Sequence, residues 1–283
     1  GVGARALGLG KAYTAILDTS YSPYWNAAKL GLNQKYSIDT MSSSVFAEVN
    51  NKYFNYSQPI YDNWSMSVGY LMVSVDDIQK SVFNSSTEKV VLTGEKFVYE
   101  SSSFFLASGT QLSVLSNDLY AGLNLKVIQE RLDNKTGQGI GVDVGMLYAL
   151  PARKVTLGLA YINAITPEIK WNTKSKVTEK YPQALKLGIA YEPLESLLFA
   201  CDLKCFDDED ICVSTGIEYA VLKVNDLTFA LRGGLFDLSK GFENNLALGA
   251  GIQLSGLKLD YAYAQAPEEY MEASQWISFG YEL

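Results

Sequence analysis

The sequence predicts an all-β protein, a 14-stranded antiparallel transmembrane β-barrel with a short N-terminal plug. Three observations lead to this fold class. The chain has 283 residues, a length that suits one closed barrel. Apolar side chains recur at every second position in segment after segment. Although 48% of the residues are hydrophobic, no run of about 18 apolar residues predicts a membrane-spanning helix.

The alternation is clear in residues 117–132, where Leu119, Leu123 and Leu125 share one face and Asn124 and Lys126 lie on the other. This period of two is the signature of a strand with one apolar and one mixed face. The mixed faces are crowded with glycine, alanine and serine. Such small side chains are unusual for a solvated face, but they suit the interior of a membrane barrel whose apolar face meets lipid. A soluble β-rich protein with the apolar face as its core remains the alternative.

Connections between the segments support the barrel, because short and longer ones alternate, as in outer membrane barrels. The two longest predicted loops are 77–98 and 164–182, and only the turn near residue 50 breaks the alternation. An even number of strands also allows closure, which removes exposed strand edges. The predicted strands are 34–49, 51–60, 63–76, 99–114, 118–131, 139–150, 153–163, 183–192, 195–206, 211–222, 225–237, 244–255, 257–266 and 273–283.

Residues 1–33 precede the first strand and differ in character, so we divide the chain into an N-terminal plug segment, 1–33, and a barrel, 34–283. The stretch "WNAAKLG" predicts a short helix that Asn26 caps and Gly31 ends. A helix this short needs packing partners. Because a 14-stranded barrel lined by small residues leaves interior space, we expect this segment inside the barrel or across its periplasmic mouth. A loose N-terminal tail is the alternative.

The first thirty residues resemble the N-terminal signature of PorV/PorQ-type outer membrane proteins, relatives of the FadL long-chain fatty acid transporters. The signature reads Gly-Ala-Arg-Ala-x-Gly-x-Gly, followed by an aromatic residue and Trp-Asn-Pro-Ala-Gly-Leu. Ala27 replaces its proline and Lys29 replaces its second-part glycine. Segments between 139 and 283 are also similar to this family. The matching residues of the motif are Gly3, Arg5, Gly8, Gly10, Trp25, Asn26, Ala28 and Leu30.

Composition argues against several functions. The chain has no histidine, which removes the commonest general base and metal ligand, so we expect no enzyme, no cofactor and no metal site. The acidic stretch 206–210 is more typical of a solvated loop than of a cation site. A net charge of −8 argues against nucleic acid as a partner. Cys205 and Cys212 count to opposite faces of neighbouring strands and are not expected to form a disulfide.

Charged residues recur on the mixed faces of the predicted strands. One interpretation is a polar lane for a solute or a docking surface for the plug. The other, which the pattern favours, is a set of cross-strand ion pairs that stiffen the wall. The predicted lumen-facing charges are Lys126, Asp143, Lys186, Asp202, Lys204, Glu218, Arg232, Lys258 and Asp260.

The resemblance implies a location in the bacterial outer membrane, after removal of a signal peptide, with membrane lipids as surroundings. It also implies two functions from different classes. FadL relatives take up hydrophobic compounds, so one expectation is passage of a small hydrophobic molecule past the plug. PorV relatives export surface proteins, so the alternative is a barrel that binds, anchors or shuttles a surface or secreted protein through its external loops. A structural envelope barrel is a third reading.

Overall fold

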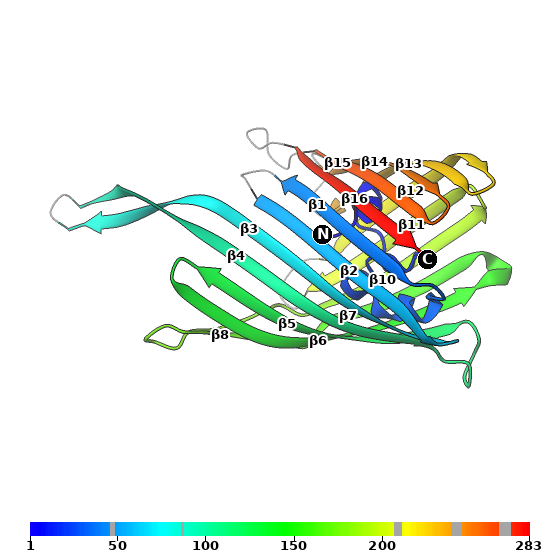
Figure 1. Cartoon of the computed structure of the whole chain (residues 1–283), viewed down its shortest axis with the longest axis horizontal. Helices are drawn as coiled ribbons and strands as arrows, with labels where there is room; N and C mark the ends of the chain where they lie inside the picture. The colour runs from blue at the N-terminus through cyan, green and yellow to red at the C-terminus, as the bar shows by residue number, and fades with distance from the viewer. Residues whose placement is uncertain (46–48, 86–87, 207–210, 239–244, 266–272) are drawn as a thin grey trace.

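The computed structural model describes residues 1–45, 49–85, 88–206, 211–238, 245–265 and 273–283. Within these residues, fourteen antiparallel strands form the wall of a closed barrel (Figure 1). Each strand pairs with the wall strands that precede and follow it in the chain, and β1 closes the barrel by pairing with β16. The strands of the wall are β1 (Ser37–Val45), β2 (Val49–Tyr61), β3 (Trp64–Asn84), β4 (Lys89–Gln111), β5 (Leu119–Leu132), β6 (Lys135–Leu150), β7 (Val155–Ile165), β10 (Ala184–Leu194), β11 (Leu197–Phe206), β12 (Cys212–Val224), β13 (Leu227–Leu235), β14 (Leu246–Leu254), β15 (Leu257–Ala264) and β16 (Ser274–Glu282).

The apolar rows face outward, as the alternation predicts. Along β5, Leu123, Leu125 and Val127 are 56%, 42% and 41% exposed, while Asn124 and Lys126 between them are buried in the interior. The same alternation runs along β14 and β16. A continuous apolar outer surface with polar groups enclosed is the arrangement of a barrel that meets lipid.

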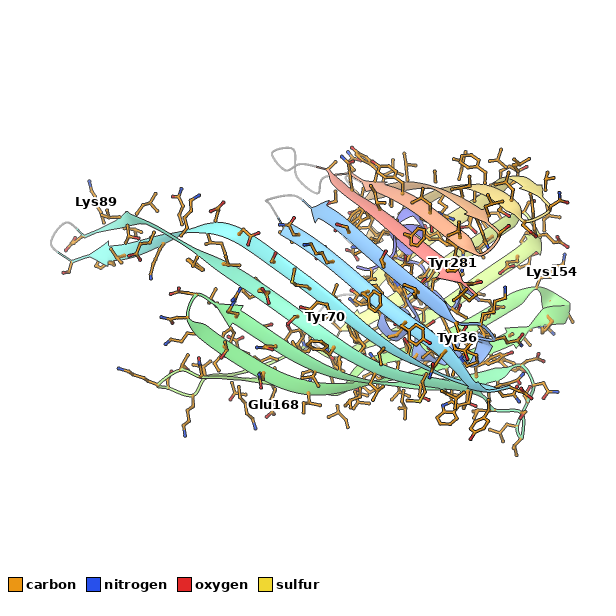
Figure 2. All side chains as sticks on the ribbon, viewed as in Figure 1. Tyr36, Tyr70, Lys89, Lys154, Glu168 and Tyr281 are labelled. Atoms are coloured by element: carbon orange, nitrogen blue, oxygen red, sulfur yellow. The ribbon has the colours of Figure 1, made fainter. Side chains whose placement is uncertain are left out.

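The two ends of the barrel differ. One end, the short-turn end, carries the connections 62–63, 112–118, 151–154, 195–196, 225–226 and 255–256, with the 3-10 helix η2 (Pro151–Arg153) among them. At the opposite end, which we call the hairpin end, β3 and β4 extend as a two-stranded ribbon far beyond the rest of the wall (Figure 1). Figure 2 shows Lys89 near the tip of this ribbon and Lys154 at the short-turn end.

The prediction of two long loops is wrong, because the first is largely strand and the second contains two short strands. In the predicted loop 77–98, β3 continues to Asn84 and β4 begins at Lys89. The predicted loop 164–182 contains the strands β8 (Glu168–Trp171) and β9 (Thr178–Lys180), and β8 pairs with β6. The turn predicted near residue 50 is also misplaced, since β1 ends at Val45 and β2 begins at Val49.

Residues 1–33, the N-terminal segment, lie within the barrel (Figure 1). They form the helices α1 (Ala4–Gly8) and α2 (Ser22–Trp25) and the 3-10 helix η1 (Ala27–Leu32). α1 packs against β13 to β16, and η1 packs against β3 to β6 on the other side of the lumen. Leu17, 43% exposed, is an exception in a segment that is otherwise largely buried. None of the described helices is long and apolar enough to cross a membrane.

Candidate functional site

The interior of the barrel is the candidate functional site, and glycines of the wall shape it. An added Cβ at Gly234 would lie 2.2 Å from the nitrogen of Gly10, and one at Gly122 would lie 2.3 Å from the carbonyl carbon of Ala27. Real Cβ atoms do not approach backbone so closely. The N-terminal segment therefore lies directly on the bare backbone of the wall at these positions. Similar contacts occur at Gly109, Gly158 and Gly216.

Two motif glycines, Gly8 and Gly10, allow this close approach from the side of the N-terminal segment. Gly3 and Gly10 have positive φ angles of 84° and 63°, which favour glycine over residues with a side chain, and an added Cβ at Gly3 would meet the ring of Tyr21 within the segment. An added Cβ at Gly10 would lie 2.6 Å from the backbone of Leu235, and one at Gly8 would lie 3.1 Å from Gly249. The Gly-x-Gly pattern thus reflects backbone-to-backbone packing.

Asn26 is a central fastening point of the segment. Its Oδ1 accepts a hydrogen bond from the N–H of Ala28 at 3.1 Å, which caps η1 as the sequence predicts. Its Nδ2 lies within hydrogen-bonding distance of three carbonyl oxygens, those of Thr14, Met146 and Leu159. One amide side chain therefore joins two parts of the segment to β6 and β7. The sequence did not indicate this second role.

The other residues of the second motif are buried around Asn26. Trp25 donates from Nε1 to the carbonyl oxygen of Val2 at 2.8 Å, which ties α2 to the start of the segment. Ala28 and Leu30 are fully buried. Gly31 does not end the helix as predicted, because η1 continues to Leu32. An added Cβ at Gly31 would lie 2.7 Å from the backbone of Thr110, so this glycine serves contact with the wall.

Four of the predicted lumenal charges form a network with the N-terminal segment on its short-turn side. Glu218 accepts hydrogen bonds from Arg5 at 2.7 and 2.9 Å and is also paired with Arg232. Arg232 in turn pairs with Asp260. Arg5 reaches a second carboxylate, Asp18, at 2.7 Å. Cross-strand pairing and docking of the segment, which were separate interpretations of the sequence, occur here in one network.

Asp18 of the N-terminal segment completes this network. Lys258 lies 3.5 Å from Asp18 and also pairs with Glu282 of the wall. Burial alone would raise the pKa of Asp18, but Lys258, Arg5 and hydrogen bonds from Tyr13 and Ser20 hold that pKa well below its usual range. Asp18 is therefore an anion that joins two parts of the segment through Arg5 and fastens them to Lys258 of β15. No sequence pattern around Asp18 indicated this role.

The remaining predicted charges lie on β5, β6, β10 and β11. Asp202 accepts hydrogen bonds through Oδ2 from the N–H groups of Tyr13 and Thr14, at 3.0 and 2.9 Å, and from the Thr14 hydroxyl. Lys126 pairs with Asp143 at 2.6 Å. The third group consists of Lys186 and Lys204, whose ammonium groups lie over the rings of Trp25 and Phe206.

Lys29, which replaces a glycine of the family pattern, is fully buried. Its Nζ donates to the carbonyl oxygen of Tyr13 at 2.7 Å and lies 3.8 Å from the centre of the Tyr13 ring. Burial lowers the pKa of Lys29 to about 7. A lone charged residue among small and apolar neighbours could have indicated this contact from the sequence.

None of the three cysteines is in a disulfide. Cys205 is opposite Leu185 and Cys212 is opposite Lys204 in the strand pairing, so the two thiols lie on opposite faces of the wall, as the register predicts. Cys212 is buried and lines the lumen. Of the acidic stretch 206–210, residues 207–210 lie outside the described part of the chain.

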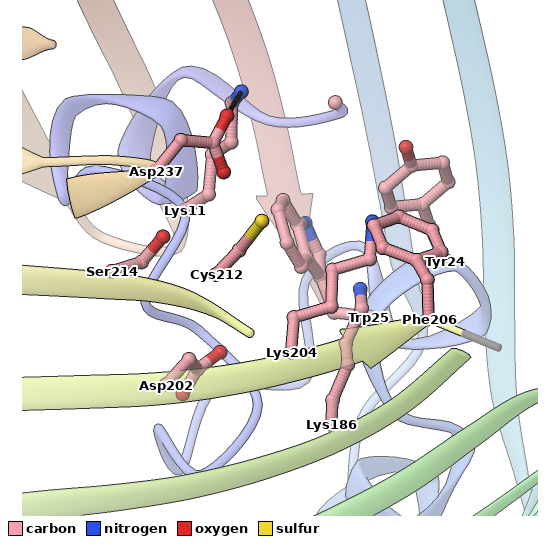
Figure 3. A pocket seen from close by; sticks show the side chains of 11 residues that line it. Lys11, Tyr24, Trp25, Lys186, Asp202, Lys204, Phe206, Cys212, Ser214 and Asp237 are labelled. Atoms are coloured by element: carbon pink, nitrogen blue, oxygen red, sulfur yellow. Dashed lines mark ion pairs between the residues drawn. The ribbon is translucent and has the colours of Figure 1, made fainter. Parts of the chain in front are cut away.

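Cavities lie on both sides of the N-terminal segment. On the hairpin side, one of about 330 Å³ is lined by Trp25, Tyr24, Lys186, Lys204 and Asp202 among others (Figure 3). A second of about 290 Å³, with Phe105, Ile128 and Ser103 in its walls, shares Tyr24, Lys186, Lys204 and Phe206 with the first. On the short-turn side, a polar cavity of about 230 Å³ surrounds Arg5 and Arg232.

Comparison with known proteins reveals relatives of this architecture. No profile of a known protein family matches the sequence, and no protein of curated function matches it. Solved structures do. The toluene transporter TodX of Pseudomonas putida superimposes with a TM-score of 0.69 at 12% identity, over 100% of this chain and 99% of that one. The barrel shares its fold with toluene transporters.

Two further structures agree. The toluene transporter TbuX of Ralstonia pickettii gives a TM-score of 0.66 at 13% identity, and the monoaromatic hydrocarbon channel CymD gives 0.67 at 13%. Each comparison covers 100% of this chain and 98% of the other. These neighbours have the barrel fold that the resemblance to FadL relatives implies, and they do not bear on its PorV part.

Proposed function

We propose that the protein is an outer membrane channel through which small hydrophobic compounds pass. The observation that carries this proposal is a closed barrel with an apolar outer surface, whose lumen holds aromatic-walled cavities directly against the N-terminal segment. The shared fold with channels named for toluene and monoaromatic hydrocarbons supports it. Short turns face the periplasm in outer membrane barrels, so the hairpin end would face outward and the two cavities on the hairpin side would be reached from outside.

In this proposal the N-terminal segment acts as the plug. It lies between the cavities on the hairpin side and the polar cavity around Arg5, so a compound that crosses the barrel has to pass it. The segment is fastened by side-chain contacts, such as those of Asn26 and Asp202, rather than by strand pairing. Such contacts can be exchanged without unfolding the wall, which is what passage requires.

Filling a cavity tests the proposal. Cells that produce the protein should accumulate radiolabelled toluene faster than cells that lack it. Ser103→Trp places a large side chain in the second cavity, and uptake should fall to the level of cells without the protein. Ser81→Trp, on the exposed ribbon, is the matched control and should leave uptake unchanged. Equal uptake with and without the protein would contradict the proposed function.

A second candidate function, binding of a surface or secreted protein, is favoured by the ribbon of β3 and β4. Beyond Val75 and Tyr99 neither strand pairs with another described strand except its partner in the ribbon. Phe83, Val90 and Leu92 share one face there and are 67%, 69% and 60% exposed. Open edges and exposed apolar side chains are features of strand-mediated protein recognition.

Shortening the ribbon separates the two candidate functions. A variant that lacks residues 79–95, closed by a tight turn, should retain toluene uptake if the protein is a channel. If the ribbon holds a partner, the shortened variant should release specific proteins from the cell surface into the medium. An unchanged set of surface proteins would argue against the second candidate.

A further inference from the structure

An apolar pocket, which we call the mouth pocket, lies at the short-turn end between the N-terminal segment and two turns of the wall. It has a volume of about 290 Å³ and lies beside Lys154, which Figure 2 labels at this end of the barrel. In the orientation proposed above, the mouth pocket is on the periplasmic side. Its apolar lining residues are Leu17 of the segment and Ala149, Leu150, Pro151, Val155 and Leu194 of the wall.

The charged residues around the mouth pocket have other partners or are exposed. The Nζ atom of Lys154 donates to the carbonyl oxygen of Pro193 at 2.7 Å, and Glu195 pairs with Lys223 at 3.3 Å. Glu192 is exposed. The pocket therefore offers mainly apolar surface, and such surface binds neutral hydrophobic compounds.

Residues 14–17 of the N-terminal segment lead from a hairpin-side cavity to the mouth pocket. Thr14 donates through its N–H and its hydroxyl group to Oδ2 of Asp202, and Asp202 lines the cavity of Figure 3. Leu17 is 43% exposed in a segment that is otherwise largely buried, and it lines the mouth pocket. Residues 14–17 belong to neither α1 nor α2, so they can shift without breaking a helix.

The wall behind residues 14–16 is bare backbone. Gly158 of β7 and Gly188 of β10 are directly opposite each other in the strand register. An added Cβ at Gly158 would lie 2.6 Å from the carbonyl oxygen of Thr14, and one at Gly188 would lie 2.9 Å from the Cβ atom of Thr14. If residues 14–16 moved off the wall, these two positions would have no side chain to fill the space.

This glycine pair lies between the two cavities along the strands. On the hairpin side of Gly158, Ala160 is opposite Lys186, which lines both cavities there. On the short-turn side, Thr156 lines the mouth pocket. A strand rises about 3.3 Å per residue, so Thr156 and Ala160 are about 13 Å apart. Displacement of residues 14–16 would therefore connect the cavities through a short passage.

We propose that the mouth pocket is a second binding site for the transported compound, which reaches it along Gly158 and Gly188 when residues 14–16 move off the wall. This inference rests on the proposed function and adds a route and an exit site to it. The ligand class is a neutral hydrocarbon that also fits the hairpin side, because the mouth pocket and the second cavity there each have a volume of about 290 Å³.

Photolabelling of the purified full-length protein in lipid nanodiscs tests the binding site. The probe is a phenyl diazirine, a photoreactive compound close to toluene in size, and mass spectrometry maps its adducts. Adducts should form at Leu17 and Leu194 in the mouth pocket and at Phe105 and Ile128 on the hairpin side. Excess toluene should remove the adducts at both places, whereas adducts on the lipid-facing rows should persist.

A charge in the mouth pocket should separate the two places. Leu17→Asp should abolish the adducts of the mouth pocket and leave those at Phe105 and Ile128. Leu115→Asp is the matched control, because Leu115 is 74% exposed at the same end of the barrel and does not line the pocket. Leu115→Asp should be labelled as the wild type is.

Thiol accessibility tests the route. In a protein whose three native cysteines are replaced by serine, Ala15→Cys places a thiol in the stretch that lies on Gly158 and Gly188, where Ala15 is 1% exposed. A compound on this route favours the displaced stretch, so toluene should speed modification by a small maleimide about fivefold or more, the usual scale of coupling between sites. Ala6→Cys, in the equally buried α1, is the control and should react at one rate with and without toluene.

The outcomes separate this inference from the proposed function. If toluene competes with adducts on the hairpin side but with none in the mouth pocket, the second site is overturned while the proposed function stands. The same holds if Leu17→Asp keeps its mouth-pocket adducts. An equal effect of toluene on Ala15→Cys and Ala6→Cys overturns the route. If toluene competes with no adduct inside the barrel, both the inference and the proposed function are overturned.

Discussion

Replacing Gly234 with alanine is expected to loosen the N-terminal segment while the barrel wall stays intact. The added Cβ would lie 2.2 Å from the nitrogen of Gly10 and 2.3 Å from the carbonyl carbon of Leu9. Both are backbone atoms, so no side chain can rotate to relieve the contact. Gly233, the next residue, offers a matched control, because a Cβ there meets no atom closer than 3.9 Å.

The size of the effect follows from the contact. Overpacking of a close-packed interior costs about 1–3 kcal/mol. If that cost destabilises the state in which the segment is packed on the wall, the population of the detached state rises by about 5-fold to 150-fold. Hydrogen exchange reports such local opening directly. Amide exchange of residues 5–14 should accelerate by this factor in Gly234→Ala and stay unchanged in Gly233→Ala.

Amide hydrogen exchange of the barrel wall provides the internal reference. Amides of β13 and β14 next to Gly234 belong to a continuous ladder and should keep their wild-type protection in both variants. If residues 5–14 exchange at the same rate in Gly234→Ala and Gly233→Ala, the segment is not held by backbone contact with the wall, and the reasoning about the glycines fails.

Three further predictions concern the fastening of the segment. Arg5→Met leaves Glu218 and Asp18 without a buried partner and should lower the free energy of unfolding by about 3–5 kcal/mol. Arg131→Met removes an exposed ion pair with Glu100 and should cost about 1 kcal/mol or less. Urea unfolding followed by tryptophan fluorescence compares the two variants. Asn26→Ala leaves buried carbonyl groups without a donor and should cost at least about 1–3 kcal/mol in the same assay; a loss below that of Arg131→Met would contradict the assigned role. Because the pKa of Lys29, about 7, lies below the value of roughly 10.4 for the unfolded chain, unfolding takes up a proton and stability should rise between pH 7 and pH 10. Lys29→Met should remove that part of the rise, and identical pH profiles for the two proteins would refute it.

The wall was the most predictable part of the molecule. Period-two alternation fixes which side chains lie on a common face, so the outward position of Leu123 and Leu125 followed from sequence alone. The positions at which strands begin and end did not follow from this alternation. Residues 77–98 carry many polar and charged side chains, which are typical of a loop. They form a ribbon because each paired residue has its partner only five (89 − 84) to nineteen (97 − 78) residues away in the chain.

The site was predictable in kind but not in its contacts. The small residues of the inner faces indicated that something occupies the lumen, and the motif around Gly10 and Asn26 indicated the N-terminal segment. Which wall glycine meets which part of the segment depends on the register of strands far apart in the chain, as with Gly122 and Gly234. The network of Arg5, Glu218 and Arg232 depends on how the N-terminal segment, β12 and β13 are placed relative to one another, and no local sequence pattern encodes that placement.

The seam between β1 and β16 joins the first strand of the chain to the last. The N-terminal segment precedes every strand of the wall in the chain, and it touches β3 to β6 on one side and β13 to β16 on the other. It therefore offers both halves of the barrel one common inner surface on which to pack. A barrel that closed without it would enclose bare glycine backbone and the buried charges of Asp202, Glu218 and Arg232 with fewer partners.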